Sequence, residues 1–140
     1  MRRWLSRCEQ DTVAVGREIG AAAAPSGVVL LAGDLGTGKT VLVRGVAEAL
    51  GIDPAEIQSP SFTLMRSHRG KGGSLLHVDL YRLEPDDVPE LGLEEALHGG
   101  GVTVVEWGQK LPFAVPGAIR LWLRRGRGER EREIREVGTL

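Results

Sequence analysis

The chain has 140 residues, a formal net charge of −1 at pH 7 and a single cysteine, Cys8. This length fits one domain, expected over residues 1–140, and the balanced charge argues against a dedicated nucleic-acid binder. One cysteine excludes an internal disulfide framework, and the sequence offers no signal peptide or membrane-length apolar run, so we expect a cytoplasmic protein without a membrane partner.

The first predicted elements are a helix over residues 7–23 and a strand over residues 27–32. Ser6 and Glu9 have the spacing of a capping box, and small or apolar residues follow at helical intervals until Pro25. The next residues form an unbroken apolar run, which is typical of a strand buried on both faces.

A complete phosphate-binding loop follows this strand. Residues 33–40 read Gly-Asp-Leu-Gly-Thr-Gly-Lys-Thr and lead into a helical pattern that ends at Gly51. In such a loop, backbone N–H groups surround phosphates, a lysine (here Lys39) reaches the β- and γ-phosphates, and a hydroxyl (here Thr40) binds Mg²⁺. The sequence therefore predicts that the chain binds a nucleoside triphosphate, with contacts from Gly33, Gly36, Thr37, Gly38, Lys39, Thr40 and Val41.

The remaining pattern predicts strands and one short helix. Phe62–Met65 is expected to form a hairpin with residues 75–79 through a turn at residues 70–73. A helix is expected over residues 88–97, a buried strand over 102–106, and a closing antiparallel hairpin over 118–123 and 131–137. Because the later strands lack long helical crossovers, we expect an α/β, P-loop NTPase-like domain with a mixed central β-sheet flanked by helices.

Charged residues near strand ends are the other candidates for chemistry. Asp79 and Glu106 each end a predicted strand, and either could act on Mg²⁺ directly or through water while the other orients the attacking water. The three histidines, at 68, 77 and 98, lack metal-ligand spacing. Seven arginines and four glutamates in residues 118–140 make this end mildly basic, and they favour a solvated strand face.

Five ordered motifs resemble a known family. They are residues 33–40, Ser59–Leu64, His77–Leu83, Glu90–Leu93 and Val105–Trp107, and their order and spacing are similar to those of the bacterial TsaE (YjeE) ATPases. The resemblance implies a protein that binds and slowly hydrolyses ATP and acts on the TsaB and TsaD proteins. TsaD transfers a threonylcarbamoyl group to adenosine 37 of tRNAs that read codons beginning with adenine, so contact with tRNA would be indirect.

The resemblance also implies roles for individual residues. It makes Lys39, Asp79 and Glu106 the catalytic residues, with Thr40 and Glu106 as Mg²⁺ ligands. It places residues 59–63 in a switch-like segment beside the γ-phosphate. It adds nucleotide contacts from Glu9, Gln109 and Arg130, with Arg132 as the alternative to Arg130 if the strand register differs by two.

Three other functions compete with this interpretation. A small-molecule kinase would share the phosphate loop but must close a lid over its acceptor. A GTP switch would need the guanine-reading motif Asn-Lys-x-Asp, and the chain contains no asparagine. A nucleotide-binding module without turnover would have nearly the same sequence.

Overall fold

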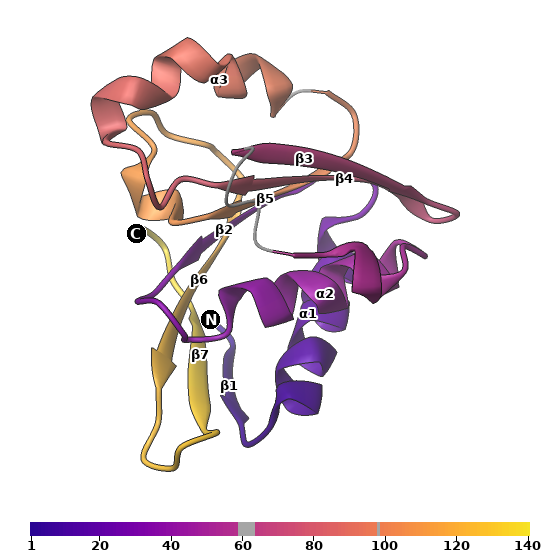
Figure 1. The fold of residues 1–140 in the computed structure, drawn as a ribbon, viewed down its shortest axis with the longest axis vertical. Coiled ribbons are helices and arrows are strands. Elements are labelled where there is room, and N and C mark those ends of the chain that lie inside the picture. The colour runs from indigo at the N-terminus through magenta and orange to yellow at the C-terminus, as the bar shows by residue number, and fades with distance from the viewer. Residues whose placement is uncertain (59–63, 98) are drawn as a thin grey trace.

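The computed structural model describes residues 1–58, 64–97 and 99–140. Its strands form one mixed sheet in the order β1-β7-β6-β2-β5-β4-β3 (Figure 1). Strands β4, β5, β2 and β6 are parallel, whereas β3 and β7 run antiparallel to their neighbours. The predicted mixed sheet is therefore confirmed. The strands are Arg3–Ser6 (β1), Val28–Ala32 (β2), Met65–Gly70 (β3), Gly73–Asp79 (β4), Val102–Glu106 (β5), Ile119–Arg125 (β6) and Arg132–Glu136 (β7).

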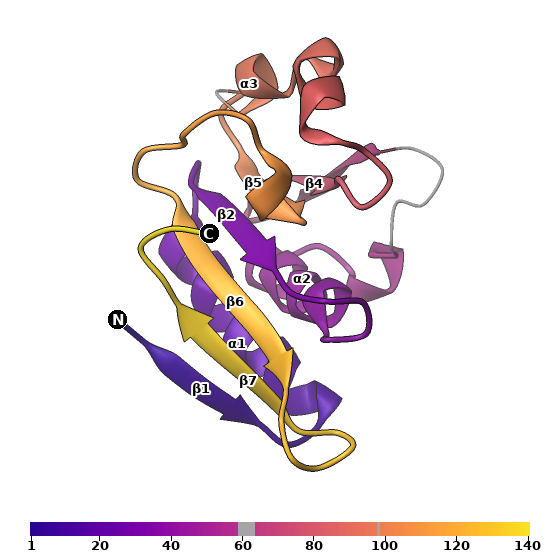
Figure 2. The same ribbon diagram turned by 90° about the vertical axis from the view of Figure 1, so that its left-hand side faces the viewer.

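Helices cover both faces of the parallel part of the sheet (Figures 1 and 2). Helices α1 (Glu9–Ala23) and α2 (Lys39–Ala49) pack on the face that carries Val29 and Leu31, and the other face carries Leu30. This second face is covered by the 3₁₀ helix η2 (Pro85–Leu91), by α3 (Leu93–Ala96) and by η3 (Gly108–Lys110). Because β2 is covered on both sides, its sequence is continuously apolar.

Helices α1 and α2 cross with their backbones in contact. A Cβ atom added at Gly16 would lie 2.1 Å from the Leu42 carbonyl oxygen, and one added at Gly45 would lie 2.1 Å from the Val13 carbonyl oxygen. Only glycine fits at these two positions without moving a helix. This close crossing sets the distance between the first turns of α1 and α2, which face the same cavity.

The N-terminal prediction needs two corrections. Residues 3–6 form strand β1, which pairs with β7, and α1 begins at Glu9 instead of residue 7. The predicted capping box is wrong: the N-cap is Cys8, and no side chain among the described residues caps the helix. Ser6 instead bonds to the Cys8 carbonyl oxygen at 2.8 Å and to the Thr12 hydroxyl at 2.7 Å.

In the middle of the chain, the structure differs from the predicted elements in two places. Strand β3 begins at Met65 and continues to Gly70, whereas the expected strand began at residue 62, and residues 62 and 63 lie outside the described part of the chain. The helix expected over residues 88–97 is divided into η2 and α3. Pro89 lies inside η2, and Gly92, with φ 68°, separates the two helices. Both residues disfavour a continuous α-helix.

The closing hairpin is formed by β6 and β7, as predicted. On its solvated face, Glu133 bonds to Arg124 at 2.7 Å and to Arg135 at 2.9 Å, and it lies 3.4 Å from Arg3. Arg2 pairs with Glu136 at 3.3 Å. Many of the C-terminal charges therefore neutralise one another, which supports the interpretation as a solvated strand face. Among the described residues, no helix is both long and apolar enough to cross a membrane.

Candidate functional site

The glycine-rich loop connects β2 to α2 in a conformation that depends on its glycines. Gly36 has φ 74° and Gly38, the N-cap of α2, has φ 98°, both in the left-handed region. The Thr37 hydroxyl donates a hydrogen bond of 2.8 Å to the Asp34 carbonyl oxygen across the loop. The loop therefore turns back on itself and directs the N-terminus of α2 toward the cavity, as phosphate binding requires.

The side chain of Lys39, the first residue of α2, reaches back into this loop. Its ammonium donates to the carbonyl oxygens of Gly33 and Asp34, both at 2.6 Å, and lies 4.7 Å from the centre of the Trp107 ring. Only 5% of the residue is exposed. Burial lowers the pKa of Lys39, and the carboxylates of Glu106, Asp79 and Asp34 oppose this shift. A buried ammonium on flexible methylene groups can exchange these carbonyls for phosphate oxygens.

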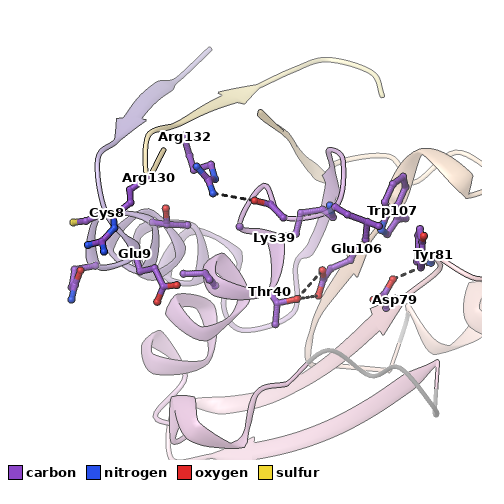
Figure 3. A pocket seen from close by; sticks show the side chains of 16 residues that line it. Cys8, Glu9, Lys39, Thr40, Asp79, Tyr81, Glu106, Trp107, Arg130 and Arg132 are labelled. Atoms are coloured by element: carbon purple, nitrogen blue, oxygen red, sulfur yellow. Dashed lines mark hydrogen bonds between the residues drawn. The ribbon is translucent and has the colours of Figure 1, made fainter. Parts of the chain in front are cut away.

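A cavity of about 670 Å³ lies in front of the loop (Figure 3). This volume suits a nucleotide-sized ligand. The start of α1 and the residues before β7 form one wall, and the ends of β4 and β5 form the other. The structure brings most of the predicted site residues together here: Glu9, Gly36, Gly38, Lys39, Thr40, Val41, Asp79, Glu106 and Arg130.

Two acids and a hydroxyl meet at the floor of the cavity. Asp79 and Glu106 are paired in the register of β4 and β5, so both carboxylates lie at the same edge of the sheet. The Thr40 hydroxyl lies 3.1 and 3.0 Å from the two carboxylate oxygens of Glu106, which is 3% exposed. Asp79 accepts a 2.9 Å hydrogen bond from the Tyr81 backbone N–H. The two strand ends thus place both acids beside the first turn of α2.

These oxygen donors fit Mg²⁺ in their chemistry, because this ion prefers hydroxyl, carboxylate, phosphate and water oxygens. The described residues contain no cluster of three or more His, Cys, Asp or Glu side chains that could hold a metal ion alone. A Mg²⁺ ion that is bound mainly by substrate phosphates and water needs only one or two protein ligands. The donor set is therefore suited to a metal–nucleotide complex and not to a metal alone.

Aromatic side chains close the cavity beside the acids. Trp107 has φ 61°, an uncommon value for a residue other than glycine, and this turn directs the chain away from β5 immediately after Glu106. The Tyr81 ring lies 5.2 Å from the Trp107 ring, with the planes inclined at 39°. The strained backbone at Trp107 thus allows the indole to cover Lys39.

Gln109 does not line the main cavity, and its predicted contact with the nucleotide stays a prediction. Gln109 lies in η3 and lines a second cavity of about 380 Å³ behind the phosphate loop, together with Asp34 and Trp122. The turn at Trp107 accounts for this placement. Gly33 and Thr37 also line the second cavity, although both belong to the loop itself. The predicted switch-like segment, residues 59–63, lies outside the described residues.

Both arginines considered for the final hairpin line the main cavity. The Arg132 guanidinium donates to the Gly36 carbonyl oxygen at 3.1 Å and to those of Glu129 and Glu131 at 2.9 Å each. Figure 3 shows Arg130 and Arg132 on the same side of the cavity as Glu9. Both arginines therefore line the cavity, and Arg132 also contacts the loop through Gly36.

Sequence reasoning missed His77 and several residues of the walls. His77 is fully buried on β4, and its Nε2 atom lies 2.5 Å from a carboxylate oxygen of Glu106. Spacing along the sequence does not indicate this contact, because it joins two strands. The position of His77 two residues before Asp79, on the same face of β4, was the available signal. The other missed lining residues are Cys8, Gln10, Thr12, Leu35 and Tyr81.

The parallel strands, the glycine-rich loop and the acids at the strand ends define a P-loop NTPase-like fold. A sequence model of the family described as "Threonylcarbamoyl adenosine biosynthesis protein TsaE" matches residues 6–134. The chain therefore belongs to the TsaE family, as the five motifs indicated.

Individual relatives agree with this assignment. The tRNA threonylcarbamoyladenosine biosynthesis protein TsaE of Bacillus subtilis (strain 168) is 38% identical over 133 residues, which cover 94% of this chain and 82% of the relative. The protein of the same name from Treponema pallidum (strain Nichols) is 41% identical, covering 81% of this chain and 84% of the relative. A crystal structure of YdiB from Bacillus subtilis matches with a TM-score of 0.74 at 34% identity, covering 95% of this chain and 82% of that one.

Proposed function

We propose that this protein binds ATP with Mg²⁺ and hydrolyses it slowly, as an accessory protein in the formation of threonylcarbamoyladenosine at position 37 of tRNAs that read codons beginning with adenine. The relatives' names place them in this biosynthesis. The observation that carries the ATP proposal is the contact of Thr40, in the phosphate loop, with Glu106, at a strand end. This contact brings the glycine-rich loop and the acids at the strand ends together in one cavity.

Each residue of the site has a role in this proposal. The backbone N–H groups at the start of α2 would bind phosphate oxygens, and Lys39 would neutralise charge that develops on them. Thr40 and Glu106 would hold Mg²⁺, which supplies further charge neutralisation when it is bound. Asp79 would accept a hydrogen bond from the attacking water and so orient it.

The walls would hold the rest of the nucleotide. Glu9 lies at the start of α1, and Arg130 precedes β7, so these residues face the cavity from elements far apart in the sequence. Positive charge from Arg130 and Arg132 would attract the nucleotide, although Arg132 is already held by main-chain carbonyl oxygens. We propose that hydrolysis is slow until partner proteins, TsaB and TsaD, bind and complete the site.

ATP turnover tests this proposal. It would be measured with Mg²⁺ for the protein alone, for TsaB and TsaD alone, and for the three proteins together. We expect weak turnover alone and stimulation in the mixture. Lys39→Ala should remove the stimulation, whereas Lys71→Ala, in an exposed turn outside the cavity, should keep it.

Other outcomes would contradict the proposal in different ways. Phosphorylation of an added small molecule would indicate a kinase, and stronger binding of GTP than of ATP would indicate a different nucleotide. Binding of ATP without turnover in any mixture would indicate a nucleotide-binding module. Normal turnover by both Asp79→Ala and Glu106→Gln in the presence of the partners would show that the acids are wrongly assigned.

A further inference from the structure

His77 is a buried histidine beside the acidic part of the site. It is fully buried on β4, and its Nε2 atom lies 2.5 Å from Oε2 of Glu106 on β5. In the register of the two strands, His77 is opposite Val104, and Asp79 is opposite Glu106. The Glu106 side chain therefore leans back along its strand to reach the diagonal neighbour on the same face.

The neighbouring groups indicate which ring nitrogen of His77 carries a proton. The Glu106 carboxylate also lies within hydrogen-bond distance of the Thr40 hydroxyl, and the Nδ1 atom of His77 has no hydrogen-bond partner among the described residues. A proton on Nε2 makes the short contact a hydrogen bond to a carboxylate and leaves only a lone pair at Nδ1. A proton on Nδ1 would bury an N–H group without an acceptor, which is less favourable. The geometry therefore favours a proton on Nε2.

We propose that His77 is a positioning residue that acts through Glu106. Its N–H group fixes one carboxylate oxygen, so the carboxylate cannot rotate away from Thr40. The Thr40 hydroxyl can donate its single proton to Glu106 and keep its oxygen lone pairs directed to a metal ion. Hydrogen-bonding partners behind a metal ligand commonly fix its orientation in this way. This inference rests on the proposed binding of Mg²⁺ and nucleotide.

A simpler role for His77 is to fill space between β4 and α2. The two roles differ in what a substitution must preserve. His77→Gln keeps an N–H donor near the position of Nε2, and His77→Leu fills a similar volume without a donor. His77→Asn is polar but too short to reach Glu106. If His77 only fills space, His77→Leu should behave most like the unmodified chain. If His77 positions Glu106, His77→Gln should do so.

Calorimetry with a non-hydrolysable ATP analogue would separate the two roles, because it measures binding and not turnover. Each variant would be titrated once with Mg²⁺ and once with EDTA, and its melting temperature would be recorded. For His77→Leu and His77→Asn, we expect the affinity gained from Mg²⁺ to fall by about 10-fold or more, with the affinity in EDTA changed less than about 2-fold. His77→Gln should recover most of the gain. His68→Gln, on β3 outside the cavity, should match the unmodified chain.

Specific results would overturn the inference. If His77→Leu keeps the full gain from Mg²⁺, or if His77→Gln is folded and loses as much as His77→Asn, His77 does not position Glu106. If His77→Leu fails to fold, the comparison of glutamine with asparagine decides. If the unmodified chain binds the analogue but gains nothing from Mg²⁺, the inference fails while nucleotide binding stands. If it binds no nucleotide at all, the proposed function fails as well.

Discussion

The crossing of α1 and α2 predicts that Gly45→Ala destabilises the protein. The added Cβ would lie 2.1 Å from the Val13 carbonyl oxygen and 2.8 Å from the Arg17 backbone nitrogen. To reach an ordinary contact of about 3.5 Å, the helices must separate by more than about 1 Å. Overpacking against backbone costs about 3 kcal/mol, and the better helix propensity of alanine offsets about 1 kcal/mol. We therefore expect a net loss of about 2 kcal/mol in the free energy of unfolding.

Urea denaturation followed by circular dichroism would measure this loss, which corresponds to a decrease in melting temperature of roughly 5–10 °C for a chain of this length. Gly20→Ala is the matched control in the same helix interface, because its Cβ would meet the Ala49 side chain at 2.8 Å and the Val46 backbone at 3.0 Å. It should cost less than Gly45→Ala. A Gly45→Ala variant as stable as the unmodified chain would refute the close helix crossing, and a more damaging Gly20→Ala would show that the closest approach is not at Gly45.

Three further predictions concern single side chains. Lys39→Ala should weaken ATP binding by roughly 10- to 100-fold, measured by calorimetry, because a charge-assisted contact is lost; unchanged affinity would contradict its role. Asp79→Asn should keep ATP affinity but slow single-turnover hydrolysis in the presence of TsaB and TsaD, and an unchanged rate would exclude Asp79 as the residue that orients water. Hydrogen bonds from Arg124 and Arg135 lower the pKa of Glu133 from 4.5 to about 2, so its contribution to stability is present above pH 4.5 and is lost as the pH falls toward 2. Melting temperatures in that window should therefore fall less for Glu133→Gln than for the unmodified chain, and parallel curves would contradict this.

The parts of the site that depend on local sequence were predictable. The loop at residues 33–40 and the strand ends at Asp79 and Glu106 all lie where the pattern indicated. Local patterns determine these features, because a glycine-rich turn between a strand and a helix has few possible conformations. Both acids were expected to act at one site, but their pairing across β4 and β5 was not predicted.

Features that depend on contacts between distant segments were not predictable. Strand β1 has only four residues and an alternation too short to recognise, and its pairing with β7 defines it. The contact of His77 with Glu106 needs the register of β4 and β5, which one sequence does not provide. The position of Gln109 depends on the turn at Trp107, which has an uncommon backbone angle. In each case the missing information was a spatial relation and not a residue type.

Pairing of β1 with β7 has a consequence for the order of folding. The contact between Arg2 and Glu136 joins residues 134 positions apart, so closing this loop costs more entropy than any local step. Helix α2 is local in sequence, whereas β2, which precedes the phosphate loop, pairs with β5 and β6. The opposite wall, with Glu9 at the start of α1 and Arg130 before β7, depends on the long-range pairing of β1 and β7. This wall of the cavity therefore forms only when the two ends of the chain have paired.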